Sequence, residues 1–212
     1  MIRLYCALIG YIFGCVQTSF FYGKKQGIDI REHGSGNAGT TNALRVMGAR
    51  AGVITFIGDL GKMLLACLVT WLIFRGMGED YRLVRFLYTG IGVILGHDFP
   101  LFMDFKGGKG VAATGGLMLI LHWIMAVYAF LTFFGLTVCT RIVSLASCLM
   151  VAGEWIIFLI LSLTGALNLG ILPLWEALLI FSLIVLLALI RHTENIKRLI
   201  RGEEKKISFR SK

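Results

Sequence analysis

The feature that most constrains the fold is a series of apolar runs, each near the length needed to cross a bilayer. They lie at about 2–22, 51–75, 84–97, 111–138, 143–163 and 173–190. A transmembrane helix needs about 20 mostly apolar residues, because the hydrocarbon core is roughly 30 Å thick and each helical residue advances about 1.5 Å. Since hydrophobic residues also make up 57% of the chain, the sequence predicts an all-α integral membrane protein.

The first run could be a signal peptide, because it opens with Arg3 and contains small residues. It is long, however, and no small-residue cleavage site with a soluble domain follows it, so we predict that it is kept as a span. There is no soluble segment, low-complexity tract or sequence repeat. Residues 1–212 are therefore predicted to form a single membrane-embedded domain.

The positive charges predict the orientation. Most lysines and arginines lie in three segments, 23–50, 98–110 and 191–212. The positive-inside rule places all three in the cytoplasm, which explains the net charge of +9 without nucleic-acid binding. They share one side only if the number of helices is odd, so we divide the run 111–138 at His122 and Trp123. The prediction is about seven transmembrane helices, with the N-terminus outside and the C-terminus cytoplasmic.

Neither the cysteines nor the histidines form a ligand pattern for a metal. The five cysteines share no C-x-x-C spacing and mostly fall inside apolar runs, so we interpret them as small buried hydrophobic residues. We predict no metal and no cofactor. Asp59 and Lys62, three residues apart in the second run, should pair with each other or face the protein interior, as a structural pair or as part of a binding site.

Small and polar residues gather in "HGSGNAGTTN", residues 33–42. Glycines at 34, 36 and 39 allow positive φ angles and close approach, so successive N–H groups there could hold an anion. A helix that begins near Thr41 and carries Arg45 would point its positive end at the same anion. The alternative is a surface turn with a helix cap.

A second glycine-rich stretch, "FKGGKGVAATGG" at 105–116, places Lys106 and Lys109 around two glycines before an apolar helix. A Walker P-loop needs Ser or Thr after its lysine, and Gly110 stands there instead. The pattern therefore indicates a phosphate group rather than a nucleotide with Mg²⁺. The alternative is that the lysines extend from a helix end toward the membrane surface.

The third stretch is "RHTENIKRLIRGEE", residues 191–204. On a helix, His192, Asn195 and Leu199 share one face, with Arg191 and Arg198 nearby. These side chains would offer polar groups at the membrane surface. The alternative is a basic juxtamembrane helix that binds anionic headgroups.

Together and in this order, "GSGNAGTTN", "GHDFPLFMDFKGGKGVAATGG" and "ENIKRLIRGEE" resemble the bacterial acylphosphate-dependent glycerol-3-phosphate acyltransferases, the PlsY family. The resemblance implies an inner-membrane enzyme with its active site on the cytoplasmic side. Such an enzyme moves a fatty acyl group from acyl phosphate to the 1-position of sn-glycerol 3-phosphate. The products are lysophosphatidic acid and phosphate, in the first acylation of phospholipid synthesis.

The resemblance also implies site residues. Acyl phosphate would be bound by Gly34, Ser35, Gly36, Asn37, Gly39, Thr41 and Asn42, and glycerol 3-phosphate by Arg45, Lys109, Ser144, His192 and Asn195. Catalytic roles would belong to Ser35, Lys109, His192 and Asn195. Thr40 stands where the family usually has alanine and Glu203 where threonine is common, and neither change removes a ligand group.

Two questions stay open at this level. Either His192 or the substrate's own phosphate could accept the proton of the attacking hydroxyl; a histidine base would give the pH–rate profile a limb near neutrality. A transporter of a phosphorylated metabolite would also need glycine-rich anion loops, and a non-catalytic scaffold that binds anionic lipid would need only the basic helix ends. None of the four histidines is followed five positions later by aspartate, as a His/Asp acyltransferase dyad requires.

Overall fold

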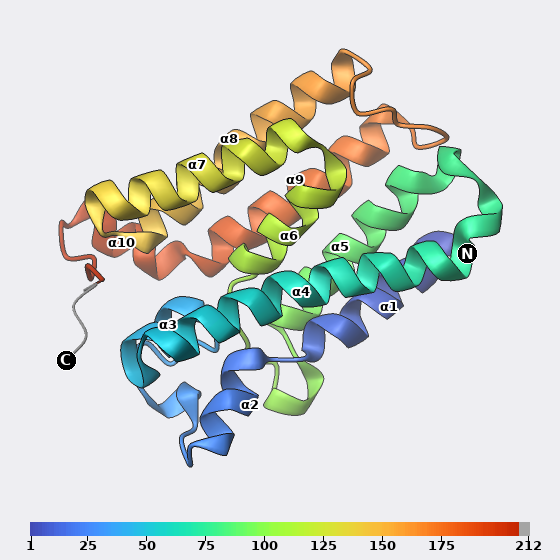
Figure 1. The fold of residues 1–212 in the computed structure, drawn as a ribbon. Helices are drawn as coiled ribbons and strands as arrows, with labels where there is room; N and C mark the ends of the chain where they lie inside the picture. Colours follow the sequence, from blue (N-terminus) through green and yellow to red (C-terminus); the bar gives the residue numbers. More distant parts are fainter. Residues whose placement is uncertain (208–212) are drawn as a thin grey trace.

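A computed structural model describes residues 1–207 and shows a bundle of helices (Figure 1). The α-helices are α1 (Ile2–Cys15), α2 (Thr18–Lys25), α3 (Thr40–Met47), α4 (Ala49–Phe74), α5 (Arg82–Asp98), α6 (Val111–Leu121), α7 (Trp123–Thr140), α8 (Val143–Leu163), α9 (Leu174–Arg191) and α10 (Thr193–Ile200). Short 3₁₀ turns lie at η1 (Ile30–Glu32), η2 (Arg75–Met77), η3 (Glu79–Tyr81) and η4 (Leu101–Met103). No β-strand occurs among the described residues, which confirms the all-α prediction.

The long helices are those of a multi-pass membrane protein. Six helical segments are long and apolar enough to cross a bilayer, and α6 is a shorter apolar helix. The run 111–138 divides where it was predicted to, because His122 adopts an extended backbone with φ −162° and ψ 141° and its ring accepts a hydrogen bond from the N–H of Ile124 at 3.2 Å. The N-terminus and α10 lie at opposite ends of the bundle (Figure 1), as an odd number of passes requires.

The first apolar run differs from the prediction of one continuous span, because α1 ends and α2 begins around Val16 and Gln17. The freed carbonyl groups find donors inside the protein, as a break at membrane depth requires. Lys62 Nζ donates to the carbonyl of Gly14 at 3.1 Å and to that of Val16 at 2.8 Å. Lys62 also forms the predicted pair with Asp59, at 3.2 Å, and both side chains are buried.

Small residues bring α1 and α5 close together. Gly10 and Gly14 on α1 face the backbone of α5, and Gly92 and Gly96 on α5 face the backbone of α1, so that a Cβ atom on any of the four would overlap a backbone carbonyl. Pairs of small residues spaced by four are typical of closely packed membrane helices. This packing fixes the end of α5, from which the loop to α6 starts.

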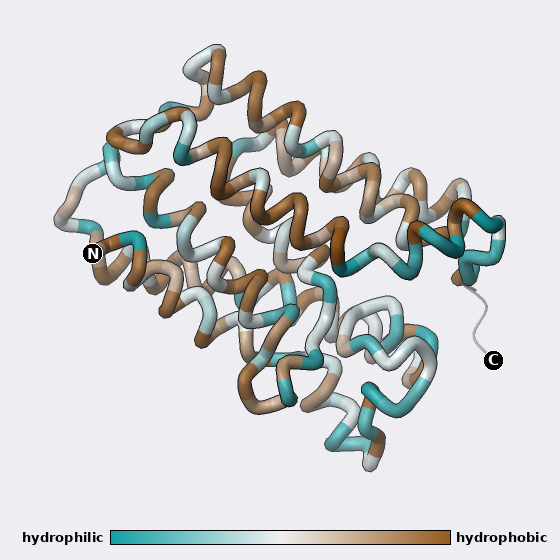
Figure 2. Tube along the Cα trace, turned by 180° about the vertical axis from the view of Figure 1, so that it is seen from behind, coloured by the Kyte–Doolittle hydropathy of each residue, from teal (hydrophilic) through white to brown (hydrophobic). Residues whose placement is uncertain are grey.

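The core lies between the long helices, where Phe158 of α8 stacks on Phe181 of α9 with ring centroids 4.0 Å apart. Cys6 and Cys67 are buried as expected, whereas Cys139 is exposed, and all five cysteines are free. Figure 2 shows hydrophobic residues along the helices and hydrophilic ones gathered at the end of the bundle that holds the C-terminal segment.

Candidate functional site

One cavity of about 990 Å³ opens at the end of the bundle where α3 and α10 lie (Figure 1). Every residue that the sequence proposed for the site lines this cavity: Gly34, Ser35, Gly36, Asn37, Gly39, Thr41, Asn42, Arg45, Lys109, Ser144, His192 and Asn195. The three sequence stretches, far apart along the chain, therefore meet at one place.

The glycine-rich loop 33–42 is organised from within by Asn42. This side chain is 2% exposed; its Oδ1 accepts from the N–H of Ser35 at 2.9 Å, and its Nδ2 donates to the carbonyls of Ile30 at 3.2 Å and His33 at 2.9 Å. Gly34, at φ 67°, packs so tightly on Asn42 that a side chain there would overlap the amide. Because the whole amide of Asn42 is used inside the loop, it holds the shape of the loop.

The backbone donors of this loop are arranged differently from the expected nest. The N–H of Gly36 donates to His33 at 3.0 Å and that of Gly39 to Asn37 at 3.0 Å, so these groups are already used. The helix α3 begins at Thr40, one residue earlier than expected. In the described part of the chain, the N–H groups of Thr40 and Thr41 have no acceptor. The positive end of α3 therefore offers the free donors for an anion.

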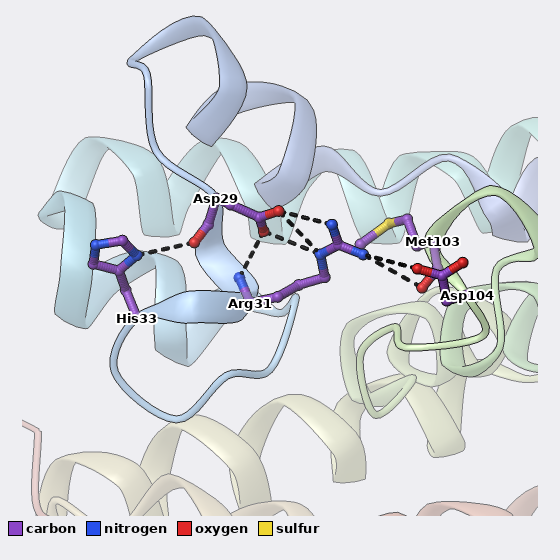
Figure 3. A network of polar contacts seen from close by, with 5 residues as sticks. All are labelled: Asp29, Arg31, His33, Met103 and Asp104. Carbon is purple, nitrogen blue, oxygen red and sulfur yellow. Dashed lines mark hydrogen bonds and ion pairs between the residues drawn. The ribbon is translucent and has the colours of Figure 1, made fainter.

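Arg31 connects the glycine-rich loop to the loop after α5 (Figure 3). Its guanidinium pairs with the carboxylate of Asp29 at 2.7 Å, donates to the carbonyl of Met103 at 3.5 Å and lies 4.0 Å from Asp104. The hydrogen bond from Arg31 lowers the pKa of Asp29. His33 contacts the Asp29 carbonyl through Nδ1 at 3.0 Å. This connection could not be predicted from local sequence, because the two loops lie about 70 residues apart, as the separation of Arg31 and Met103 shows.

The loop at residues 105–110, which carries Lys106 and Lys109 and is called the lysine loop below, uses its glycines for packing rather than for phosphate binding. The N–H of Gly107 donates to Asp98 at 3.2 Å and that of Gly108 to His97 at 3.0 Å. A side chain on Gly108 would overlap the His97 ring. From the opposite side, Arg191 donates to the carbonyl of Gly108 at 2.8 Å. The loop is therefore clamped between α5 and α9.

Lys109 follows this clamped loop and lines the cavity. Its ammonium donates to Oδ1 of Asn195. Burial, together with the positive charges of Arg198 and Arg191, lowers the pKa of Lys109 to about 8 despite the opposing effect of Glu204. Lys109 is thus largely charged at neutral pH and gains strongly from an anionic ligand. Lys106 also lines the cavity but is exposed.

Glu204 is the site residue that the sequence reasoning missed. Its carboxylate accepts from Ser144 at 2.9 Å, from Asn195 at 2.6 Å and from Arg198 at 2.7 Å. Burial favours a raised pKa, but these three donors hold the pKa of Glu204 below its usual range. The residue fixes polar groups from α8 and α10 around the cavity. The only sequence signal was an acidic pair that ends a basic segment, which a solvated tail would also show.

His192 lies at the junction of α9 and α10 rather than on an emerging helix face, and it is 5% exposed. Its Nδ1 donates to the carbonyl of Ala188 at 2.8 Å, so the lone pair of the neutral ring lies on Nε2. Burial and the nearby Lys109 charge lower the pKa of His192 to about 4. A limb caused by His192 would therefore lie near pH 4, not near neutrality as the sequence suggested.

The other half of the cavity is apolar and lies between α4, α6 and α7. Its lining residues are Phe56, Leu60, Val111, Leu119, Ala126, Ala129, Phe130, Phe133 and Phe134. Phe130 is 62% exposed and Leu119 52% exposed, so this half reaches the outer apolar surface of the bundle. A single cavity thus joins a cationic end to an apolar groove that opens sideways, a shape suited to an amphiphile with an anionic head.

Known proteins share both the sequence and this architecture. The family model described as glycerol-3-phosphate acyltransferase matches residues 4–202. A glycerol-3-phosphate acyltransferase of Symbiobacterium thermophilum is 38% identical over 209 residues, covering 97% of this chain and 95% of the relative. One of Exiguobacterium sibiricum is 36% identical, covering 97% and 93%.

Two solved structures agree with the fold along nearly the whole chain. The crystal structure of PlsY, an integral membrane glycerol 3-phosphate acyltransferase, in its glycerol 3-phosphate form matches with a TM-score of 0.81 and 32% identity, covering 97% of this chain and 96% of PlsY. Its lysophosphatidic acid form matches with a TM-score of 0.79. With the family model covering most of its length, this chain belongs to the glycerol-3-phosphate acyltransferase family of integral membrane enzymes.

Proposed function

We propose that this acyltransferase uses acyl phosphate as its donor and esterifies the 1-position of sn-glycerol 3-phosphate. The observation that carries the proposal is the single cavity with an apolar groove at one end and cationic side chains at the other. The donor would place its acyl chain between α4 and α7 and its phosphate at the start of α3. Glycerol 3-phosphate would lie beside Arg45, Lys109, Ser144, His192 and Asn195.

The reaction needs no acyl-enzyme, because an acyl phosphate is already an activated mixed anhydride. The 1-hydroxyl oxygen attacks the acyl carbonyl carbon and forms the ester bond. The bond from the carbonyl carbon to the phosphate oxygen breaks, and phosphate leaves with the electron pair. The enzyme contributes by holding the reacting atoms about 3–3.5 Å apart and by stabilising the charge that develops, through Lys109 and the donors of α3.

The lowered pKa of His192 favours the substrate phosphate as the proton acceptor. A phosphate monoester has a second pKa of about 6, whereas burial and the nearby Lys109 charge lower the pKa of His192 to about 4. The phosphate would then be the stronger base, and Nε2 of His192 would accept the hydroxyl hydrogen bond that orients the substrate. Ser35 is exposed at the cavity and would contact the donor phosphate.

The variant His192→Ala is expected to raise the KM for glycerol 3-phosphate by about 10-fold, because a hydrogen bond at a polar site contributes on the order of 1.5 kcal/mol. The pH–rate profile between pH 5 and 8 should keep its shape. Steady-state kinetics from about pH 3.5 to pH 8, which includes the pKa of His192 at about 4, are the measurement. A fall in kcat at constant KM, with loss of an acid limb near pH 4, would instead assign proton removal to the imidazole.

Donor choice is the direct test of the proposal. Purified protein in phospholipid vesicles should form lysophosphatidic acid from palmitoyl phosphate and glycerol 3-phosphate, with release of inorganic phosphate. With palmitoyl-CoA in place of palmitoyl phosphate, no product is expected, because its acyl carbonyl carbon carries no phosphate leaving group for Lys109 and the start of α3 to stabilise. Comparable rates with both donors would contradict the proposal. Uptake of glycerol 3-phosphate into sealed vesicles without product would support a transporter.

We further propose that the chain is one membrane-embedded domain in the bacterial inner membrane, with the cavity on the cytoplasmic side. The basic segments around the cavity support this orientation. In a cysteine-free variant, Asn168→Cys should react with an impermeant thiol reagent added to intact cells, whereas Lys206→Cys should react only after lysis. Both positions are exposed, so access to the reagent depends on the side of the membrane. The opposite labelling pattern would reverse the topology.

A further inference from the structure

Lys62 forms a polar cluster inside the membrane region, behind the candidate site. Its side chain is 5% exposed and contacts four acceptors: the carbonyls of Gly14 at 3.1 Å and Val16 at 2.8 Å, Nδ1 of His97 at 2.7 Å and the carboxylate of Asp59 at 3.2 Å. A buried cation at such a position is costly unless it is paired and hydrogen-bonded. Lys62 therefore holds three helices, α1, α4 and α5, in one arrangement.

The contact with His97 links Lys62 to a residue that lines the cavity. Because the Lys62 ammonium donates to Nδ1 of His97, the ring carries its proton on Nε2. Gln17 holds the backbone of the same residue by donating to its carbonyl at 2.9 Å. His97 is 3% exposed, and both its ring and its carbonyl are held by hydrogen bonds, the ring by Lys62 and the carbonyl by Gln17.

The lysine loop rests directly on His97. The N–H of Gly108 donates to the His97 carbonyl at 3.0 Å, and the Cα of Gly108 lies against the ring at the Nε2 side. Lys109 is the next residue. Among the described residues, those lining the cavity include Asp59 and His97 but not Lys62. Any influence of Lys62 on the ligands must therefore pass through its neighbours.

We propose that Lys62 is a positioning residue for the acyl transfer: through His97 and the packed Gly108, it sets the location of the Lys109 ammonium. The inference deepens the proposed function and rests on it. A purely structural role for the Asp59–Lys62 pair predicts a different result. Its loss would lower stability, and any loss of activity would not depend on Lys109.

A double-mutant cycle tests this distinction. Asp59→Asn/Lys62→Met removes both charges together, so no uncompensated ion is left in the membrane region. Relative to the wild type, this pair of substitutions is expected to lower kcat/KM by about 10- to 100-fold, because misplacing a reacting group by about 1 Å costs on that order. In a Lys109→Ala background, the same pair of substitutions should cost less than about 3-fold, because the displaced group is already missing.

Two further variants keep the test decisive. Gln17→Met loosens His97 from its other side and should show the same dependence on Lys109; it replaces the Lys62 variant if that protein does not fold. Arg3→Met/Glu176→Gln is the matched control, because it removes a bidentate ion pair between α1 and α9 far from the cavity. The control should lower Tm and leave kcat/KM within about 2-fold, as expected of an interaction with only a structural role.

Equal costs with and without Lys109 would overturn the inference, and so would wild-type kinetics in the Lys62 and Gln17 variants. If the wild-type protein shows no acyl transfer, the proposed function fails separately. The same cycle is then measured on the Kd for inorganic phosphate by calorimetry, with the same dependence on Lys109 expected. Additive effects in that measurement would also overturn the inference.

Discussion

Replacing Gly108 with alanine is expected to lower kcat/KM by at least about 100-fold, on the scale of a reacting group misplaced by about 1 Å. The added Cβ would occupy the place of the His97 imidazole. That ring is 3% exposed and is held by Lys62 at 2.7 Å, so moving it aside would break its contact with Lys62. The loop must shift instead, which displaces Lys109. Steady-state kinetics with both substrates varied are the measurement.

The matched control is Gly61→Ala. Gly61 is half-buried on α4, and a Cβ there meets no atom within 4 Å. Alanine in a helix is more favourable than glycine by about 1 kcal/mol. This variant should therefore be at least as stable as the wild type and equally active. If Gly108→Ala were equally active, the lysine loop would tolerate displacement and the clamp would have no catalytic consequence.

Lys109→Ala is expected to reduce activity by about 10-fold to several hundred-fold, because a charge-assisted contact in a sheltered site contributes roughly 1.5–3 kcal/mol or more. The variant also leaves Oδ1 of Asn195 without its donor. The loss should appear in both kcat and the KM for glycerol 3-phosphate if Lys109 contacts a phosphate in the ground state and in the transition state.

The pH dependence provides an independent signature of Lys109. Its pKa is lowered to about 8, so wild-type activity should decline as the pH rises through 8 and the ammonium loses its proton. Lys109→Ala should lack this decline. Lys106→Met is the control, because Lys106 lies three residues earlier in the same loop and is exposed. A decline above pH 8 that persists in Lys109→Ala would assign the titration to another group.

Several elements of the fold were predictable from local sequence. The apolar runs gave the long helices, because burying a backbone in lipid requires helical hydrogen bonding. Charge placement required an odd number of passes, and His122 beside Trp123, a pair that fits a membrane boundary, located the division of the long run 111–138 where the structure has it. The Asp59–Lys62 pair followed from i,i+3 spacing alone. Each of these properties depends on residues that are close together in the sequence.

The residues that line the cavity were also predictable from the motifs, whereas the hydrogen bonds that each of them makes were not. All residues proposed from the three motifs line the one cavity. Yet the amide of Asn42 is used inside its own loop, and the N–H groups of Gly36 and Gly39 already donate to carbonyls of that loop. Among the described residues, the N–H groups of Thr40 and Thr41 have no acceptor. A motif specifies which residue types come together, but hydrogen bonds are exclusive, and their allocation depends on the folded loop.

The sequence by itself therefore determined a multi-pass helical membrane protein, the three stretches that line its cavity and the family to which it belongs. Only the tertiary structure decided that Glu204 joins Ser144 to Asn195, that Arg31 ties two loops together and that Lys62 bridges the break in the first span to His97. The physical reason is the distance along the chain over which each kind of interaction acts. Periodicity and charge bias act over a few residues, whereas these contacts join atoms far apart in the chain and exist only once the helices have packed.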